Sequence, residues 1–377
     1  MPDSVSGGQR PGGDHFAICT RPTTMEWRAS LPTMPPQTPL RLVLRFLGMT
    51  LSTLVQYCLG RYTPPVDGWS LRTALSVQYL NLILENERMA ARRMTTLSSK
   101  VANLAIRDSI TAVSGPGFQG LWLGDAQEAS STDPILLYMH GGGYTTCDAR
   151  TYLSGLAELR TALATAHGID LRVLALEYTL APEARFPTQI HEAEAAYEHV
   201  VTTFPSRPVF LFGDSAGGNL ALALLQTLRD RAAPLPAPTG AVLVSPWCNA
   251  DVTAFAPSYA KYKAVDVIHA HHLRLHVDAY LPEDAPASLL QNPLVSPVHG
   301  DFTGMCPMLL HYGGKEAFSD DCKRLEEVLR RQNVPLTVEV EPLAPHITPV
   351  LGFFFKEMAA RGVAAIATFI ATTASTT

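Results

Sequence analysis

The stretch that decides the fold reads PVFLFGDSAGGNLALALLQTL and covers residues 208–228. Its first part is an apolar run typical of a buried strand, and its last part is typical of a long apolar helix. Between them lies a Gly-x-Ser-x-Gly pattern from Gly213 to Gly217, with Ser215 at its centre. A serine on so sharp a turn is pushed out from the sheet, and small flanking residues let the backbone turn. The pattern indicates a nucleophilic serine, and the alternative is a glycine-rich turn with an incidental serine.

A second glycine-rich stretch, LYMHGGGYTTCD at residues 137–148, follows another apolar run. Three successive glycines lose much backbone entropy on folding, which indicates that side chains are excluded at these positions for a functional or steric reason. A serine nucleophile needs N–H groups aimed at the oxygen on which negative charge develops. We expect Gly142 and Gly143 to present two of them, and Ala216, directly after the serine at a helix N-terminus, to present a third. A plain glycine turn is the alternative.

From about residue 117, strand-like and helix-like segments alternate. Apolar, β-rich runs occupy residues 118–124, 134–140, 171–178, 208–214, 240–247, 307–314 and 336–342, and helical patterns occupy 150–166, 188–203, 216–231, 319–332 and 354–372. This alternation predicts an α/β fold, with a mostly parallel sheet covered by helices on both faces. Ligand sites in such folds lie at the carboxyl ends of the strands, where the triple glycine and Ser215 both fall.

The rest of the chain predicts a disordered tail and a lid. Residues 1–39 are rich in Pro, Gly, Ser and Thr, which is typical of disorder. Helices are expected at 40–62 and at about 69–92, and an insertion at about 248–306 interrupts the alternation. We expect the N-terminal lid helices, 40–95, and this insertion to roof the strand ends of a catalytic domain, 96–377. Apolar lid helices favour a lipophilic small-molecule ester as substrate.

Residues 40–62 also raise the question of a membrane. Apolar side chains fall on one helical face and Arg41, Arg45, Ser52 and Gln56 on another, and the uncharged run from Phe46 to Gly60 is 15 residues long. A membrane span needs about 20 apolar residues. The pattern favours a helix packed on the protein, with peripheral membrane contact left open, over a span.

Composition excludes some classes of function. The formal net charge of −5 gives no electrostatic footprint for nucleic acid. Six scattered cysteines indicate reduced thiols, and the first 15 residues lack a signal-peptide core, so we expect a cytoplasmic or membrane-associated protein. His272 and His276 have a spacing that could bind zinc, but no acidic base partner accompanies them, so a lid helix is favoured. No metal or cofactor is predicted, and the oligomeric state stays open.

Four motifs resemble the hormone-sensitive lipase family of α/β-hydrolases: HGGGY at 140–144, EYTLAPEARFP at 177–187, GDSAGGNLA at 213–221 and SPW at 245–247. The resemblance covers roughly residues 117–372. It implies an α/β-hydrolase fold with a helical lid, ester hydrolysis, the oxyanion roles given above, and a Ser–acid–His triad in that chain order. It also implies that His140 orients the glycine loop.

By this resemblance the catalytic histidine is His346, in the loop before the last helix, and the acid follows PMLLHYGG. The family commonly has Asp-Pro-Leu there; this chain has GGKEAFSDD, which favours Glu316, with Asp320 as the alternative. Asp320 would then be a helix N-cap or first-turn residue. The chain also departs from the family at Ile347, where Gly is usual, and at Asn249, where Asp is frequent.

These features predict a serine carboxylic-ester hydrolase in which Ser215 attacks, His346 carries the proton and Glu316 orients His346, through an acyl-enzyme. Two alternatives stay open. One is a hydrolase, acyltransferase or cyclase of natural-product biosynthesis that uses the same site. The other is a ligand receptor on the same fold, although receptors that resemble this family lack the histidine that His346 supplies.

Overall fold

The computed structural model describes residues 39–85, 88–124 and 132–375. Of the expected disordered tail, 1–39, all but Pro39 lies outside these residues. The described strands form one eight-stranded sheet in the order β1-β2-β4-β3-β5-β6-β7-β8. Their bounds are β1 Ile110–Gly115, β2 Phe118–Leu123, β3 Ile135–Met139, β4 Arg172–Leu176, β5 Val209–Asp214, β6 Gly240–Val244, β7 Met308–Gly313 and β8 Leu336–Glu341. Pairing is antiparallel from β1 through β2 to β4 and parallel elsewhere, which confirms the predicted fold class.

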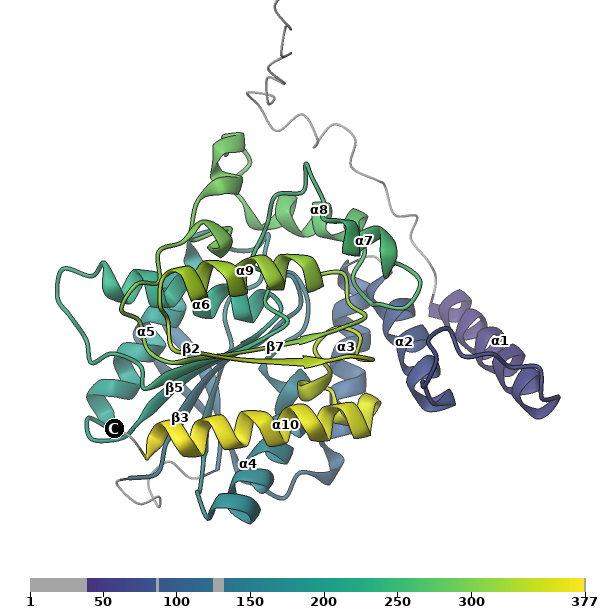
Figure 1. Ribbon diagram of the computed structural model, residues 1–377, viewed down its shortest axis with the longest axis horizontal. Coiled ribbons are helices and arrows are strands. Elements are labelled where there is room, and N and C mark those ends of the chain that lie inside the picture. Colours follow the sequence, from purple (N-terminus) through teal and green to yellow (C-terminus); the bar gives the residue numbers. More distant parts are fainter. Residues whose placement is uncertain (1–38, 86–87, 125–131, 376–377) are drawn as a thin grey trace, which may run out of the picture.

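Helices cover both faces of this sheet. Figure 1 shows α4 (Leu153–His167) and α10 (Gly352–Ala374) on one side, and α5 (Thr188–Thr203), α6 (Ala216–Arg229) and α9 (Ser319–Arg331) on the other. Successive strand residues point to opposite faces, so Leu137 packs towards α5 and α6 while Leu136 packs towards α4 and α10. Both leucines are fully buried, and each such burial contributes about 1.5–3 kcal/mol. The continuous apolar runs are therefore explained by burial on both sides.

The N-terminal part differs from the expectation of a single helix at about 69–92. The structure has α2 (Leu71–Leu84), whose N-cap Ser70 accepts the N–H of Thr73, and a separate α3 (Arg88–Ala102). The buried face of α3 consists of Ala91, Thr95 and Ser99. Small and hydroxyl side chains give a weak apolar periodicity, which is why the sequence pattern did not reveal this helix. Strand β1 was missed for a similar reason, because it is a largely exposed edge strand.

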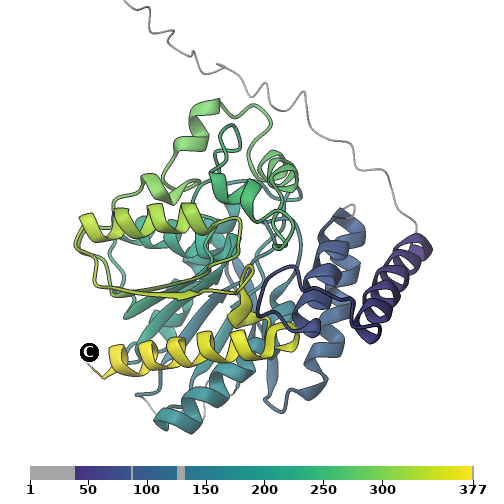
Figure 2. The same cartoon turned by 45° about the vertical axis from the view of Figure 1, so that its right-hand side comes forward.

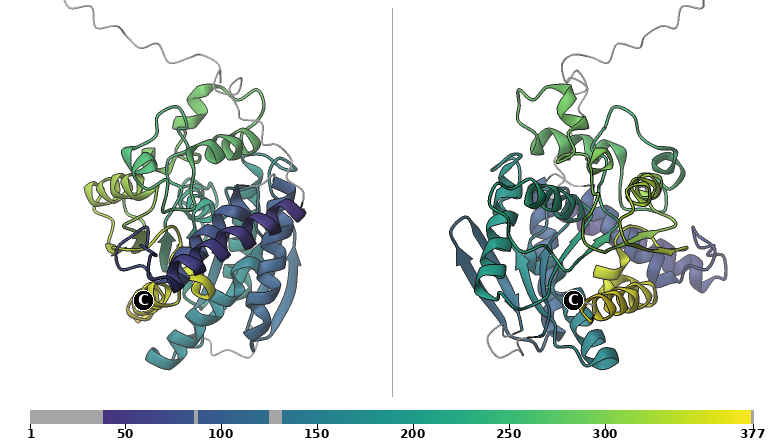
Figure 3. Two further views of the ribbon diagram at one scale, coloured as in Figure 1. Left: turned by 90° about the vertical axis from the view of Figure 1, so that its right-hand side faces the viewer. Right: turned by 60° about the vertical axis from the view of Figure 1, so that its left-hand side comes forward.

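Helix α1 (Pro39–Cys58) lies at the edge of the molecule beside α2, as Figures 2 and 3 show. Several of its large apolar side chains are exposed, among them Leu47 at 55 % and Leu51 at 64 %, whereas Phe46 packs edge-on against Tyr79 of α2. Among the described residues, no helix is long and apolar enough to cross a membrane.

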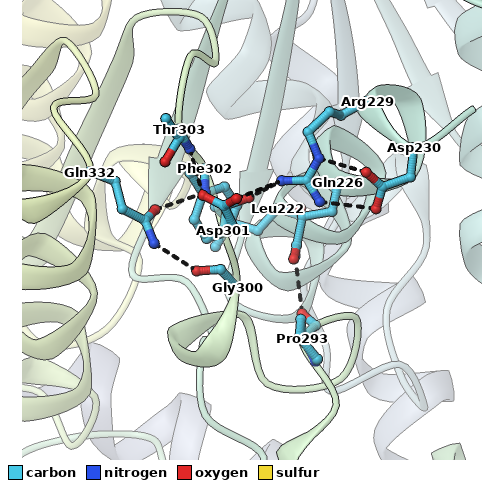
Figure 4. A network of polar contacts seen from close by, with 10 residues as sticks. All are labelled: Leu222, Gln226, Arg229, Asp230, Pro293, Gly300, Asp301, Phe302, Thr303 and Gln332. Atoms are coloured by element: carbon cyan, nitrogen blue, oxygen red, sulfur yellow. Dashed lines mark hydrogen bonds and ion pairs between the residues drawn. The ribbon is translucent and has the colours of Figure 1, made fainter.

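The insertion, residues 248–306, carries α7 (Pro257–Lys261), α8 (Ala270–Tyr280) and the short helices η4 (Ala287–Gln291) and η5 (Pro297–His299). Its returning end is fastened by two glutamines, shown in Figure 4. Gln226 of α6 donates to the carbonyl of Pro293 at 3.1 Å. Gln332, at the end of α9, accepts the N–H of Phe302 at 2.7 Å and donates to the carbonyl of Gly300 at 3.0 Å. The insertion is thus tied to two helices on one face of the sheet.

Candidate active site

Ser215 lies on the sharp turn between β5 and α6. Its backbone has φ 53° and ψ −118°, a conformation that L-residues rarely adopt, and its N–H donates to the carbonyl of Val244 at 2.9 Å. A side chain at Gly213 would overlap the carbonyl of Gly217, and one at Gly217 would overlap the carbonyl of Met139. The strained serine therefore depends on flanking glycines, and strain of this kind accumulates at functional sites.

The triple glycine forms a tight loop at the end of β3. Gly142 and Gly143 have φ of 111° and 61°, in the region that favours glycine. A Cβ on Gly143 would lie 2.7 Å from the ring of His276, and one on Gly142 would overlap the carbonyl of Thr146. Within the described residues, the N–H groups of both glycines donate to no protein acceptor. Both residues line the same cavity as Ser215.

Buried polar groups hold this loop in place. The carboxylate of Asp214 accepts the N–H of Gly141 at 3.1 Å and also the hydroxyl of Tyr138. His140 stacks on Tyr178 with 4.1 Å between ring centroids, and its Nδ1 lies 2.7 Å from the carbonyl of Gly141. Burial lowers the pKa of His140 to about 4, so the ring is neutral at pH 7 and its Nδ1–H donates to that carbonyl. His140 thus lies behind the loop as a support.

The structure brings Glu316 and His346 together. Glu316 follows β7, His346 lies between β8 and η6 (Thr348–Val350), and Glu316 Oε2 is 3.3 Å from His346 Nδ1. Both side chains are buried. His346 Nε2, on the other side of the ring, makes no hydrogen bond within the described residues, and His346 and Ser215 line the same cavity. In structures without substrate, catalytic hydrogen bonds are often unformed and tighten in the complex.

Asp320, the alternative acid, lies elsewhere. Its carboxylate accepts the N–H of Ser258 in the insertion at 2.9 Å and lies 3.4 Å from Lys323. It sits in the first turn of α9, where an acidic side chain favours the helix dipole. Glu316, rather than Asp320, is the carboxylate in contact with the imidazole ring of His346.

Ser245, the serine of SPW, supports this pair in a way that its sequence motif alone does not predict. Its Oγ donates to Glu316 Oε2 at 2.7 Å and accepts the N–H of Ile347 at 3.3 Å. Ile347 has φ 52°, a strained value for a β-branched residue, at the position where the family usually has Gly. The departure in sequence is thus accommodated by backbone strain that Ser245 helps to hold.

Asp266 of the insertion is a second support for the pair that was not predicted from the sequence. Its Oδ1 accepts the N–H of His346 at 2.9 Å, and its Oδ2 accepts the N–H of Ala317 at 2.7 Å. Nothing in the local pattern reveals this role, because Asp266 lies 80 residues from His346 in the chain.

Electrostatics favour a neutral imidazole at neutral pH. Burial lowers the pKa of His346 to about 4, and the negative charge of Asp266 opposes this. Burial raises the pKa of Glu316, and the hydrogen bond from Ser245 opposes that rise. A neutral His346 has a free nitrogen with which to accept a proton, as a general base must.

The cavity over Ser215 is lined mostly by apolar side chains from three parts of the chain. The lining includes Leu80, Ile83 and Leu84 of α2; Thr95, Ser98 and Ser99 of α3; Val267, Ile268, His269, His272, Leu273 and His276 of the insertion; and Cys147, Tyr152, Trp247, Val350, Leu351 and Phe354 of the remaining chain. Burial raises the pKa of Cys147 to about 12, so it contributes a neutral thiol to the wall.

The histidines of α8 are part of this wall. His276 Nδ1 lies 2.7 Å from Thr145 Oγ1, and burial lowers the pKa of His272 to about 3 and that of His276 to about 4. Across the part of the chain that the structure describes, no group of three or more His, Cys, Asp or Glu side chains could hold a metal ion.

With this geometry established, comparison with known proteins identifies the family. The family model for the alpha/beta hydrolase fold matches residues 136–349. The chain belongs to this α/β-hydrolase family. A crystal structure of an esterase from the bacterial hormone-sensitive lipase family superposes with a TM-score of 0.71 at 26 % identity, covering 81 % of this chain and 99 % of that one. The predicted relationship to the hormone-sensitive lipase family is confirmed.

Several curated relatives are named as ester hydrolases. The chain is 37 % identical over 228 residues to an acetyl-hydrolase of Streptomyces hygroscopicus, covering 60 % of this chain and 71 % of the relative. It is 30 % identical over 212 residues to the carboxylic ester hydrolase LipN of Mycobacterium tuberculosis, covering 52 % of each. It is 33 % identical over 124 residues to steryl acetyl hydrolase 1 of Saccharomyces cerevisiae, covering 32 % of this chain and 28 % of the relative. This α/β-hydrolase is an ester-hydrolysing enzyme.

Proposed function

We propose that this enzyme is a serine carboxylic-ester hydrolase that cleaves lipophilic small-molecule esters with Ser215, His346 and Glu316 as its triad. One observation carries the proposal. A serine on a strained turn lines the same cavity as a histidine whose Nδ1 lies 3.3 Å from a buried carboxylate. This is the arrangement by which a weak hydroxyl nucleophile is activated.

In acylation, His346 Nε2 takes the proton of Ser215 Oγ as the oxygen attacks the ester carbonyl. The carbonyl oxygen becomes an oxyanion, which the N–H groups of Gly142, Gly143 and Ala216 stabilise. The tetrahedral intermediate then expels the alcohol, which takes the proton from His346. In deacylation, water repeats the attack on the acyl-enzyme, and the acid leaves. Glu316 accepts Nδ1–H throughout, and so fixes the tautomer and stabilises the imidazolium.

The cavity wall supports a lipophilic substrate. Leu80, Leu84 and Ile268 belong to the two segments, 40–95 and 248–306, that we propose as the lid over the site. Two relatives are named for hydrolysis of acetyl and steryl acetyl esters. We therefore propose the acetyl ester of a lipophilic alcohol as the substrate class, since apolar walls bind the alcohol and a small acyl group fits beside the glycine loop.

We also propose that α1 docks on an anionic membrane surface from which such esters reach the cavity. Its exposed apolar side chains include Leu47, Leu51 and Leu54. Residues 39–66 contain arginines but no Asp or Glu, so the segment suits a negatively charged surface. A helix of this kind binds in the plane of the interface with its apolar side chains buried.

The test of the proposed chemistry is covalent labelling. A fluorophosphonate probe is expected to modify folded enzyme once, on the peptide that carries Ser215, and Ser215→Ala is expected to abolish both labelling and hydrolysis of p-nitrophenyl esters. We expect kcat of Ser215→Ala to be about 10⁶-fold below that of the wild type, as when the triad serine of another serine hydrolase is replaced. Undiminished labelling of folded Ser215→Ala protein would contradict the proposal. A p-nitrophenyl ester series of increasing acyl length then measures the preferred acyl group.

A further inference from the structure

Asp266 of the insertion joins the two loops that carry the catalytic pair. It precedes α8 and is fully buried. One carboxylate oxygen accepts the N–H of His346 at 2.9 Å, and the other accepts the N–H of Ala317, the residue after Glu316, at 2.7 Å. A single side chain therefore fixes the backbone of the proposed base and the backbone next to the proposed acid.

The backbone of Asp266 is itself held by the N-terminal helices. Asn81 of α2 donates its side-chain amide to the carbonyl of Asp266 at 3.1 Å, and its Oδ1 lies 2.9 Å from His269 Nε2. Val267 packs in one cluster with Trp69 and other residues of the α2 region. Asn81 thus connects α2 to Asp266, and Asp266 connects to the loops that carry His346 and Glu316.

Burial disfavours the charged form of the Asp266 carboxylate. The charge of Glu316 raises the pKa of Asp266 further, and the charge of His346 lowers it. Burial raises the pKa of Asp266 to about 6, while the nearby His346 opposes the rise. Retaining a charge that burial penalises is typical of functional sites.

We propose that Asp266 is a positioning residue for the triad: it sets the separation of His346 and Glu316, and its charge stabilises the imidazolium that forms in the reaction. The inference rests on the proposed function, because it requires His346 to be the base. The proton moves from Ser215 Oγ to His346 Nε2 and on to the leaving alcohol, and Asp266 exchanges no proton in this step.

The test is Asp266→Asn, measured on a water-soluble p-nitrophenyl ester. An amide has one carbonyl oxygen, so one of the two N–H groups loses its acceptor and faces an amide NH₂ instead. We expect kcat to fall by about tenfold or more, because a hydrogen bond to a charged group is lost at the catalytic loop, with KM changed less than about twofold. Wild-type kcat is expected to fall as pH drops through about 6, where Asp266 loses its charge, and Asp266→Asn is expected to lack this step.

Asp321→Asn is the matched control. Asp321 is also buried, and its carboxylate accepts hydrogen bonds from two residues of the insertion, Asn249 at 3.1 Å and Tyr259 at 2.8 Å. None of its hydrogen bonds reaches His346 or Glu316. We expect Asp321→Asn to lower the melting temperature but to keep kcat within about twofold, because it loosens the insertion without touching the catalytic loops.

The outcomes separate a catalytic role from a structural one. Wild-type kcat and pH profile in folded Asp266→Asn would overturn the inference, and so would an equal loss of kcat in Asp321→Asn. If Asp266→Asn does not fold, Asn81→Ala is used instead, because it removes the hydrogen bond that holds the backbone of Asp266. A lower kcat at unchanged KM supports the inference, and wild-type kcat overturns it. Loss of labelling in Ser215→Ala tests the proposed function independently, so the two can fail separately.

Discussion

The strand-end loops and helix α1 differ in how firmly their surroundings hold them. Around Ser215, buried groups fix nearly every turn: Asp214 holds the glycine loop, Ser245 holds Glu316, and Asp266 holds His346. Helix α1 lies beside α2 and exposes Leu44, Leu47, Leu51 and Leu54 to solvent. The chemistry depends on preorganised geometry, whereas α1 exposes the apolar surface that we propose docks on a membrane. Changes at the loops are therefore expected to alter kcat, and changes in α1 to alter access to the substrate.

After the loss of Ser215 itself, the largest effect is expected from the acid. Glu316→Gln keeps the size of the side chain and removes its charge, so His346 loses the group that selects its tautomer and stabilises its imidazolium. We expect kcat to fall by about 10³–10⁴-fold, as loss of a triad acid generally does. Steady-state kinetics beside a melting curve measures this, so that lost folding is not mistaken for lost chemistry.

Asp320→Asn is the control for this comparison. Asp320 accepts the N–H of Ser258 and does not contact His346, so its loss is expected to cost about 1 kcal/mol of stability and little kcat. A folded Asp320→Asn enzyme that is nearly inactive, together with an active Glu316→Gln enzyme, would reverse the assignment.

The next effect tests the glycine loop. In Gly143→Ala the new methyl group would lie 2.7 Å from the ring of His276, so the loop must move. Its N–H groups then no longer point towards the oxyanion of the proposed mechanism. We expect kcat to fall by about 10²-fold, within the range for a lost oxyanion donor. Titration of the variant with the fluorophosphonate probe gives the number of active sites, so that kcat is expressed per active enzyme.

Gly168→Ala is the matched control for backbone strain. Gly168 has φ 68°, close to the 61° of Gly143, but it caps α4 and a Cβ there meets nothing within 4 Å. We expect it to cost about 1 kcal/mol of stability and to leave kcat unchanged. If both variants lose kcat equally, strain in general, and not the aim of the glycine N–H groups, explains the loss.

The same contrast explains how far the sequence could predict this molecule. Strands β3 to β8 and helices α5, α6 and α9 follow local patterns of apolar residues, so their positions were predicted within a few residues. The Ser215 turn is partly local, because a side chain at Gly213 would overlap the carbonyl of Gly217 within the same motif, whereas Gly217 is required by the carbonyl of Met139 at the end of β3. Asp266 was missed since its partners are distant in the chain, and α3 was missed since its buried face carries Thr95 and Ser99 rather than large apolar residues.

The choice between Glu316 and Asp320 shows where the prediction became uncertain. Both are carboxylates at the end of β7, four residues apart, and family resemblance favoured the first only by counting from the strand. Only the fold shows that Glu316 is buried against Ser245 while Asp320 has turned towards Ser258 on the first turn of α9. Separations of a few residues decide which side of a turn a side chain occupies, and composition carries no information about that.

The smallest effect on chemistry, and the sharpest test of α1, is its membrane contact. Replacing Leu47, Leu51 and Leu54 by Ser removes apolar side chains that are 55 %, 64 % and 39 % exposed. We expect hydrolysis of a water-soluble ester to stay within about twofold, because surface substitutions away from a site change stability little. Binding to vesicles that contain about one third anionic lipid is expected to fall by about tenfold or more, because each buried CH₂ contributes about 0.8 kcal/mol.

The matched control replaces Ile110 and Val340, exposed at 38 % and 43 % on the two edge strands, by Ser. It removes exposed apolar surface of the same kind from the opposite edges of the sheet, and vesicle binding is expected to stay at the wild-type level. Sedimentation with anionic and with neutral vesicles measures both variants, and a carbonate wash distinguishes surface binding from insertion. If the wild-type enzyme does not bind anionic vesicles and instead forms dimers that the triple substitution disrupts, a second copy of the chain covers α1. Membrane docking would then be wrong, while the site chemistry at Ser215 would stand.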